Sequence, residues 1–491
     1  MGRSAWSASF ISVILLAIAS CGGQETQEVQ TLPTVAPTQA LIPSPTAVPA
    51  PTTAPLPSVT LTPTPRATAV LTPTMVLIPT LTPTRVAPTS TPFLSSAPAP
   101  TTIPRPLPTA TLSPTPTPES CKDVHETTII SGPPGPEGPD YDSVFRSLTV
   151  HPTDPEVVVL GTERNGFVRS DDGGLTWTRL RAGLRSDSGV YSEIWDIDIS
   201  PSNPDIMMAA TLDSPGPVLG TAPTVHAGIY RSVDGGQSWK QLNCGFPTSR
   251  VNSVRFHPAN PDIAVAGLEG GQPSYTRPES GYYGGGIFRT EDGGESWQYV
   301  RVGENDERNG YIVMTVVPTS PPTFITFGMN MSDLSQNIGF IRSTDGGKSW
   351  QAFGSEMRNR HIGSFTVSSD GQTMYADEGG TYFGWISRDA GDTWTRSAIV
   401  QVNGPIAVSP VDSDLIVFGG FNEIRRTTNA FQSVGVMFTA PVAIREIVFA
   451  PSNPNIVYAE TNGYILYRSD DAGVTWRFMV NVRKDVLNVQ P

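Results

Sequence analysis

Residues 232–239 read Ser-Val-Asp-Gly-Gly-Gln-Ser-Trp, and near-copies of this octapeptide decide the fold of the chain. Every complete copy keeps Ser or Thr at the first position, Asp at the third, Gly at the fifth and Trp at the eighth. The aspartate can accept hydrogen bonds from turn amides and the glycine permits a positive φ, so each copy predicts a tight turn. The other complete copies span residues 170–177, 290–297, 343–350, 387–394 and 469–476.

The copies recur at intervals that fit one small structural unit. Their tryptophans are 62, 58, 53, 44 and 82 residues apart. The last interval is the longest and contains an incomplete copy, residues 427–433, in which Asn429 replaces the aspartate and no tryptophan follows. Counting this copy, the body of the chain holds seven repeats.

Each repeat predicts four short strands. In the second repeat an alternating stretch, residues 194–199, ends at a proline turn and is followed by the apolar residues 206–210. Residues 228–232 then enter the octapeptide turn and residues 239–242 leave it. Short runs bounded by Pro, Asp and Gly indicate strands joined by hairpins. The sequence therefore predicts an all-β fold, a seven-bladed β-propeller of four-stranded blades, with six blades as the alternative if the incomplete copy is an insertion.

The octapeptide resembles the Asp-box, or BNR repeat. The body is therefore similar to the BNR propeller proteins, which include sialidases, xyloglucan-cleaving glucanases, sortilin-type receptors and photosystem II assembly factors. This resemblance implies the fold but not the function, because the family contains hydrolases, receptors and assembly factors.

Six equivalent aspartates do not form an active site, which needs one asymmetric set of groups. We therefore assign the motif a structural role, in which Asp organises the turn and Trp anchors it against its own blade. The residues in question are Asp172, Asp234, Asp292, Asp345, Asp389 and Asp471, with Trp177, Trp239, Trp297, Trp350, Trp394 and Trp476.

The first residues predict export. Arg3 precedes an apolar stretch, residues 10–19, that is too short for a membrane span and has the length of a signal-peptide core. Small residues then precede Cys21, which resembles the bacterial lipobox and implies lipidation of this cysteine. We therefore predict a lipoprotein signal peptide over residues 1–20; the alternative is ordinary cleavage near Ala19, with Cys21 incidental.

Residues 21–118 predict a disordered linker. Positions 24–118 contain 23 Pro and 24 Thr, no Gly and five charged residues. Proline fixes φ and removes a hydrogen-bond donor, so an extended polyproline II stalk is expected, with or without O-glycosylation. The repeats then define a propeller domain over residues 119–491.

Charge and cysteine content exclude several functional classes. Residues 119–491 carry 28 basic and 43 acidic side chains, a net charge of 28 − 43 = −15, which argues against nucleic acid as a partner. Three cysteines are too few for a cysteine-rich metal site, and we predict no metal and no cofactor. Once Cys21 is assigned to lipid, Cys121 and Cys244 remain as a candidate disulfide, with two free thiols as the alternative.

Ligands of propellers usually bind at the mouth of the central channel, on the face opposite the Asp-box turns in this family. The mouth is expected at the start of each first strand and in the neighbouring loops, where aromatic and arginine side chains favour recognition. Pairing of these side chains with nearby acids in a solvated rim is the alternative. The candidate ligand-binding residues are Arg146, Glu193, Trp195, Arg250, Tyr282, Tyr283, Arg308, Arg360, His361 and Arg445.

No catalytic residue can be assigned. Arg146, Arg250 and Arg445 match the arginine triad of sialidases by number alone, and Glu193, Glu269 and Glu446 are the acids to test for hydrolysis. We therefore predict a lipid-anchored, monomeric module of the cell envelope or surface that faces outside the cytoplasm. It would bind an extracytoplasmic protein or glycan without chemistry, and would touch the membrane only through its lipid. A glycoside hydrolase is the alternative.

Overall fold

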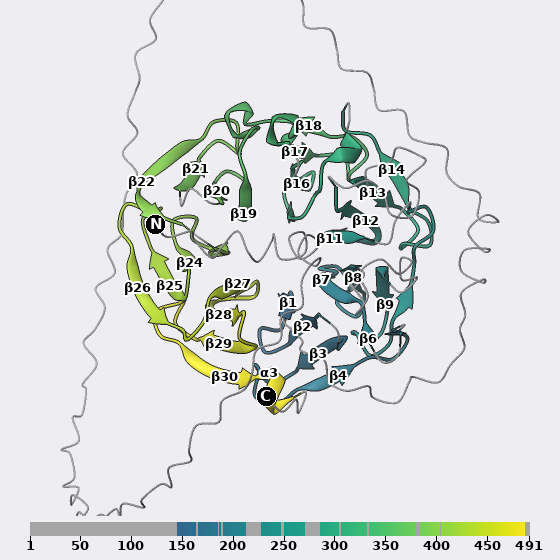
Figure 1. Cartoon of the computed structure of the whole chain (residues 1–491), viewed down its shortest axis with the longest axis horizontal. Helices are drawn as coiled ribbons and strands as arrows, with labels where there is room; N and C mark the ends of the chain where they lie inside the picture. The colour runs from purple at the N-terminus through teal and green to yellow at the C-terminus, as the bar shows by residue number, and fades with distance from the viewer. Residues whose placement is uncertain are drawn as a thin grey trace, which may run out of the picture. The chain divides into compact units, whose positions relative to one another are not determined.

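The computed structural model describes residues 145–486, apart from positions 164, 185, 188–189, 213–226, 247–249, 271–284, 304–305, 331–332, 380–382 and 403. The described residues form seven four-stranded antiparallel sheets, and in each sheet the strands follow one another in chain order. Figure 1 shows these sheets as the blades of a ring, with first strands such as β7, β11 and β19 nearest its centre. The predicted seven-bladed propeller of four-stranded blades is confirmed.

The first four blades end in short outer strands of two or three residues. Blade 1 comprises β1 (Phe145–Val150), β2 (Val158–Thr162), β3 (Phe167–Ser170) and β4 (Thr178–Leu180), and blade 2 comprises β7 (Glu193–Ile199), β8 (Met207–Leu212), β9 (Gly228–Ser232) and β10 (Lys240–Gln241). Blade 3 comprises β11 (Val251–His257), β12 (Asn260–Leu268), β13 (Gly286–Thr290) and β14 (Gln298–Val300), and blade 4 comprises β15 (Met314–Val317), β16 (Thr323–Gly328), β17 (Gly339–Ser343) and β18 (Gln351–Ala352).

The last three blades end in longer outer strands. Blade 5 comprises β19 (Ile362–Val367), β20 (Met374–Glu378), β21 (Phe383–Ser387) and β22 (Thr395–Gln401), blade 6 comprises β23 (Ile406–Val408), β24 (Ile416–Gly420), β25 (Glu423–Thr427) and β26 (Gly435–Thr439), and blade 7 comprises β27 (Ile444–Ala450), β28 (Asn453–Thr461), β29 (Ile465–Ser469) and β30 (Arg477–Asn481). The incomplete octapeptide copy joins β25 to β26, so it closes a blade and is not an insertion.

Few other elements occur in the described ranges. They are a two-stranded hairpin of β5 (Ser186–Asp187) and β6 (Val190–Tyr191), the 3-10 turns η2 (Asp306–Arg308), η3 (Leu334–Gln336) and η4 (Ser355–Met357), and the one-turn helix α3 (Val482–Asp485). No helix in this part of the chain has the length and apolar character needed to cross a bilayer.

The Asp-box turns have the predicted chemistry. In blade 1 the Oδ1 atom of Asp172 accepts hydrogen bonds from the Ser170 hydroxyl and the Thr176 amide, each at 2.8 Å. Its Oδ2 atom accepts from the Thr176 hydroxyl at 2.6 Å. These bonds favour the carboxylate and lower the pKa of Asp172 to about 2. Gly173 and Gly174 adopt φ values of 73° and 95°, which a side chain would strain.

The box tryptophans contact the preceding blade as well as their own, which we did not predict. Trp239 of blade 2 stacks on Phe167 of blade 1 with ring centroids 4.2 Å apart, and Trp394 of blade 5 stacks on Phe340 of blade 4 at 5.1 Å. The predicted anchoring within one blade is therefore only part of the contact, because the indole also packs on the preceding blade. The tryptophans therefore contribute apolar contact between neighbouring blades.

In six of the seven blades, an arginine directly before the box contacts the next blade. Arg169 of blade 1 donates to the Gly235 carbonyl in the box of blade 2, and Arg426 of blade 6 donates to the Ala472 carbonyl in that of blade 7 at 2.8 Å. The same position is arginine in every blade except blade 5, where it is Ile386. The arginines are Arg169, Arg231, Arg289, Arg342, Arg426 and Arg468.

Among the described strands, blades 1 and 7 each take their four strands from one stretch of the chain and meet at the ring closure. Blades 1 and 7 share one hydrophobic cluster, which includes Leu148 of β1 and Leu466 of β29. Arg468 pairs with Glu156, and the Tyr458 hydroxyl donates to the Pro155 carbonyl at 3.0 Å. Closure therefore depends on side chains that join the first and last blades.

Candidate functional site

The mouth of the channel lies on the face opposite the Asp-box turns. First strands run from the mouth to the proline turns, and third strands run in the same direction to the boxes, because neighbouring strands are antiparallel. The starts of β7, β11 and β19 therefore lie on this face, where we predicted the ligand-binding mouth.

One register position of the second strand decides how tightly two blades meet near the mouth. Where this residue is glycine, the next blade packs too closely for a side chain. A Cβ at Gly161, for example, would lie 2.6 Å from the Ile194 side chain of blade 2. Three blades carry a large or charged residue there and therefore break the repeat. The position is Gly161, Ala210, Gly267, Phe327, Asp377, Gly419 and Glu460 in blades 1 to 7.

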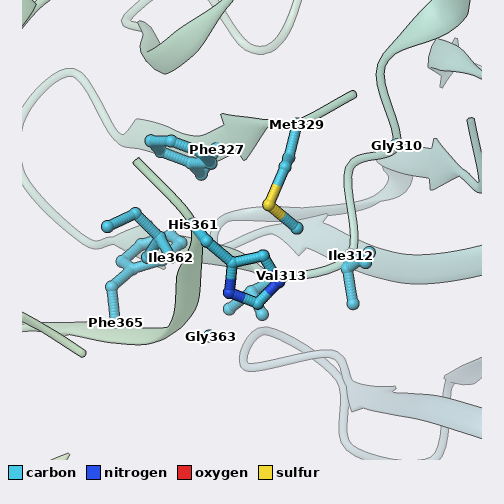
Figure 2. Close-up of a pocket in the computed structure, with 9 residues that line it drawn as sticks. All are labelled: Gly310, Ile312, Val313, Phe327, Met329, His361, Ile362, Gly363 and Phe365. Carbon is cyan, nitrogen blue, oxygen red and sulfur yellow. The ribbon is translucent and has the colours of Figure 1, made fainter. Parts of the chain in front are cut away.

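Phe327 lies in the wall of a pocket of about 30 Å³ between blades 4 and 5. Figure 2 shows the His361 ring and the Met329 thioether at this pocket. The lining is apolar apart from the imidazole, and the volume suffices for one or two small groups. The lining residues are Gly310, Ile312, Val313, Phe327, Met329, His361, Ile362, Gly363 and Phe365.

His361 is the polar group of the pocket. Its ring packs over Gly379, where a Cβ would come within 2.5 Å of Nδ1, so only glycine fits beneath it. Burial lowers the pKa of His361, because the charged imidazolium loses hydration. The side chain therefore enters the pocket as a neutral imidazole at pH 7, able to donate and accept one hydrogen bond each.

Beside the histidine, three side chains of blade 5 form a fixed cluster. Glu378 accepts a hydrogen bond from Arg360 at 2.9 Å and another from the Trp385 indole at 3.0 Å. The Arg360 guanidinium also lies over the Trp385 ring, 4.1 Å from its centroid. These contacts hold Arg360 in place and add a cation–π interaction.

Asp377 lies behind the pocket wall and is 4% exposed. A Cβ at Gly363, which lines the pocket, would be 3.2 Å from its Oδ2 atom. Burial raises the pKa of Asp377 to about 7, opposed in part by a hydrogen bond from the Gly404 backbone. No donor among the described residues reaches its Oδ1 atom.

Other acids line the channel between first strands. Asp196 and Asp198 of β7 accept from the amides of Val254 and Phe256 of β11, at 3.0 and 2.7 Å. Asp196 also pairs with Arg255. Desolvation raises the pKa of Asp198 to about 6. These carboxylates therefore join the first strands of blades 2 and 3 by hydrogen bonds.

Glu446 makes the corresponding contact between blades 7 and 1. Its Oε2 atom accepts from the Leu148 amide at 2.9 Å, and desolvation followed by the nearby Asp196 charge raises its pKa. A candidate acid for hydrolysis is thus part of the ring closure.

Most of the predicted ligand-binding residues are engaged within their own blades. Glu193 accepts from the Trp195 indole at 2.9 Å. Arg250 pairs with Glu269. Arg445 lies 3.7 Å from the fully buried Glu460. The described geometry therefore brings these candidates into local pairs.

The remaining predicted residues are placed only in part. Arg308 ends η2 between blades 3 and 4 and is half-buried. Arg146 lies on β1, but its side chain is outside what the structure describes. Tyr282 and Tyr283, like Cys21 and Cys121, lie outside the described residues. Cys244 is buried and disulfide-bonded, and its pairing with Cys121 stays a prediction.

Sequence reasoning missed the pocket and Asp377. The signal was the register position itself, because Phe327 and Asp377 stand where other blades carry Gly or Ala. Within the described ranges, no group of three or more His, Cys, Asp or Glu side chains is arranged to hold a metal ion. The arrangement offers an apolar hollow, a neutral imidazole and a fixed cation–aromatic pair, which suit binding.

Comparison with known proteins supports the fold. The family model described as sortilin, neurotensin receptor 3, matches residues 227–380. An oligoxyloglucan-reducing end-specific xyloglucanase of Emericella nidulans is 21% identical over 346 residues, which cover 63% of this chain and 41% of that enzyme. The chain thus spans about two fifths of the length of this curated relative.

Solved structures include similar propellers. YCF48 from Cyanidioschyzon merolae is 15% identical with a TM-score of 0.45, covering 68% of this chain and 95% of that one. The GH74 xyloglucanase from Xanthomonas campestris is 15% identical with a TM-score of 0.33, covering 67% and 63%.

Proposed function

We propose that this BNR/Asp-box β-propeller is a recognition module that binds an extracytoplasmic protein or glycan at its mouth and performs no chemistry of its own. The observation that carries the proposal is the engagement of the mouth acids. Glu193, Glu378 and Glu446 each accept hydrogen bonds from groups of the chain itself. Hydrolysis of a glycosidic bond needs two carboxyl groups that face the substrate.

The pocket between blades 4 and 5 supports the location of the binding site. Ligand sites are concave and mostly apolar, with a few polar groups that orient the ligand. Ile312, Met329 and Phe365 supply the apolar lining, and His361 supplies the polar group. Arg360 and Trp385 beside it are of the residue types that dominate binding energy at interfaces.

The N-terminal sequence supports a place for this activity. Lipidation at Cys21 would tether the chain to the outer face of a membrane, and the Pro/Thr-rich linker would carry the propeller away from it. A stalk of 95 residues at about 3.1 Å per residue reaches on the order of 300 Å when fully extended. The propeller would then meet partners at the cell surface.

The experiment uses the immobilised full chain and a panel of xyloglucan, mucin-type glycans and envelope proteins. Retention and the release of reducing ends are measured together. We expect retention without new reducing ends, weakened at least about tenfold by Ile312→Asp or His361→Ala, since both change the pocket. The matched control is Val411→Asp, which changes an exposed proline-turn residue on the opposite face. Retention that survives both pocket variants would overturn the proposed site.

Glycoside hydrolysis is the second candidate function. It is favoured by the similarity to the fungal xyloglucanase, although 59% of that enzyme's length has no counterpart in the match. The same panel decides, because a hydrolase releases reducing ends from xyloglucan. Release that disappears in Glu269→Gln but persists in Glu295→Gln, a control at an exposed Asp-box turn on the opposite face, would replace our proposal with this one.

A further inference from the structure

The outer edges of the seven blades are not equivalent. Outer strands present unpaired N–H and C=O groups, and proteins protect such edges with short strands or charged side chains. Blades 1 to 4 use short strands of two or three residues. The longer strands β22 and β30 carry Arg396 and Arg477, which disfavour pairing with another strand.

The edge of blade 6 lacks both protections. Strand β26 has five residues, Gly-Val-Met-Phe-Thr, and none is charged. The uncharged stretch continues from Val434 to Ala443. Among the described outer strands, β26 alone is longer than three residues and without charge. A bulge at Met437 adds twist, but β22 and β30 contain bulges as well as their arginines.

Exposed apolar side chains accompany this edge. Val436 on β26 is 52% exposed, and Phe421, in the turn between β24 and β25, is 44% exposed. The Asn422 backbone and side chain bond to Ala440 at 2.7 and 2.9 Å, which places the Phe421 turn beside the end of β26. Val442, three residues after the end of β26 and next to Pro441, is 36% exposed.

The Phe421 backbone adds an independent observation. Its φ is 53°, which is unusual for a bulky aromatic residue and costs energy. Phe431 and Tyr464 also have a positive φ, of 65° each, but Phe431 is 2% exposed whereas Phe421 is 44% exposed. In this turn the strain holds an aromatic ring in a partly exposed position beside an unprotected edge.

We propose that β26 pairs with an extended segment of a partner protein, and that Phe421, Val436 and Val442 contact its apolar side chains. The segment has a short, uncharged, β-prone core flanked by basic residues. Main-chain hydrogen bonds along the edge give affinity, and alternate side chains give selectivity, as in strand addition generally. This surface is separate from the mouth and serves a second interaction.

Charge and area favour such a segment over a second copy of this chain. Two copies, each with a net charge of −13, repel one another, whereas basic flanks are attracted. A single pair of five-residue strands also buries much less than the roughly 1,200–2,000 Å² of stable interfaces between folded proteins. A peptide segment needs no more than this edge.

The test uses a fluorescent peptide, Lys-Lys-Thr-Val-Thr-Val-Thr-Val-Thr-Lys-Lys, titrated with the full chain and followed by anisotropy. We expect saturable binding that Val436→Lys weakens at least about tenfold, because the new ammonium repels the flanks and removes apolar contact. A peptide with Pro in place of each Val should not bind, since proline cannot donate to the ladder.

Leu175→Lys is the matched control, because it adds the same charge at an exposed box turn where blade 4 carries Lys348. Equal losses in both variants, or equal binding of the proline peptide, would overturn strand pairing. If Val436→Lys does not fold, Thr439→Lys repeats the test on another exposed position of β26. Sedimentation velocity tests the remaining occupant. A wild-type dimer that dissociates in Val436→Lys or Thr439→Lys would assign the edge to a second copy of this chain and overturn the partner proposal.

Discussion

The two faces of this propeller obey different rules. On the Asp-box face, six turns repeat one set of hydrogen bonds, and Asp172 and Asp389 hold their hydroxyl and amide partners at nearly the same distances. On the mouth face, one register position holds Gly161, Phe327 and Asp377 in different blades. Repeated residues build the ring, and the residues that break the repeat give the mouth its chemistry.

Blade 6 shows how far the box can change and still fold. Asn429 accepts from the Ser433 amide and the Thr427 hydroxyl at 2.9 Å each, as the aspartates do. Its own amide donates to the Ser433 hydroxyl at 2.9 Å, where an aspartate would accept. The geometry of the turn therefore survives the loss of the charge.

The largest effect should come from breaking the clasp that closes the ring. Arg468 has a side chain that is 6% exposed and pairs with Glu156 and Asp470. We expect Arg468→Met to lower the free energy of unfolding by about 2–3 kcal/mol, because it removes the bonds of a buried guanidinium to Glu156, Asp470 and the Tyr458 hydroxyl. Urea denaturation of the full chain measures this. Arg477→Met, which removes an exposed partner of Asp470, should change it by less than about 0.5 kcal/mol; equal losses would contradict the clasp.

A smaller effect, with a distinct pH dependence, should come from Asp377. Its pKa is about 7 in the folded chain against an ordinary 3.8, so its charged form destabilises the fold. Its contribution is therefore fully present below pH 3.8 and is lost as pH rises through 7. A shift of about three units corresponds to about 4 kcal/mol, of which an amide with its own burial cost should recover about 2 kcal/mol.

We accordingly expect Asp377→Asn to raise the melting temperature at pH 8 and to leave it nearly unchanged at pH 5. Calorimetry at the two pH values makes the comparison, with Glu295→Gln as a control for an exposed carboxylate. A gain at pH 5 as large as that at pH 8 would show that the Asp377 carboxyl does not titrate in this range.

The smallest effect concerns the box itself. Asp345→Ala should cost about 1–2 kcal/mol, because it removes bonds from the Ser343 and Ser349 hydroxyls and from two turn amides. Asp345→Asn should cost less than about 0.5 kcal/mol, since blade 6 already folds with an amide.

The stabilisation that Asp345 contributes depends on pH with the opposite sign to that of Asp377. Hydrogen bonds lower the pKa of Asp345, so its stabilisation is present above pH 3.8 and is lost as pH falls through the lower pKa of the folded chain. The difference between wild type and Asp345→Asn should therefore disappear in acid. Equal costs for the Ala and Asn variants at pH 7 would mean that the charge, and not the turn geometry, is what matters.

The fold was predictable because its signals repeat. Six complete octapeptide copies and one incomplete copy, with proline turns in six of the seven repeats, predict seven four-stranded blades, and the incomplete copy with Asn429 closes a blade as the others do. The arginine before six of the seven boxes was equally visible in the sequence, yet its bond to the next blade was not, because a bond between repeats has no signature within one repeat. Arg169 and Gly235 are 66 residues apart.

The mouth was predictable only in its position. His361 lines the pocket and Arg360 lies beside it at the start of a first strand, but residue type could not show which side chains were already paired. The sequence did not show, for example, that the candidate Arg250 pairs with Glu269. Pockets arise where two blades fail to close, and Phe327 and Asp377 mark such places only by comparison with the glycines of other blades.

Hydrogen exchange of the full chain, with and without material retained by the wild-type mouth, tests the central claim most directly. Our account predicts that bound material slows exchange at residues 310–313, 327–329 and 361–365. It predicts no change in exchange rate at the Asp-box turns 170–177 and 232–239. Protection confined to the box turns would contradict it and would assign recognition to the repeated face.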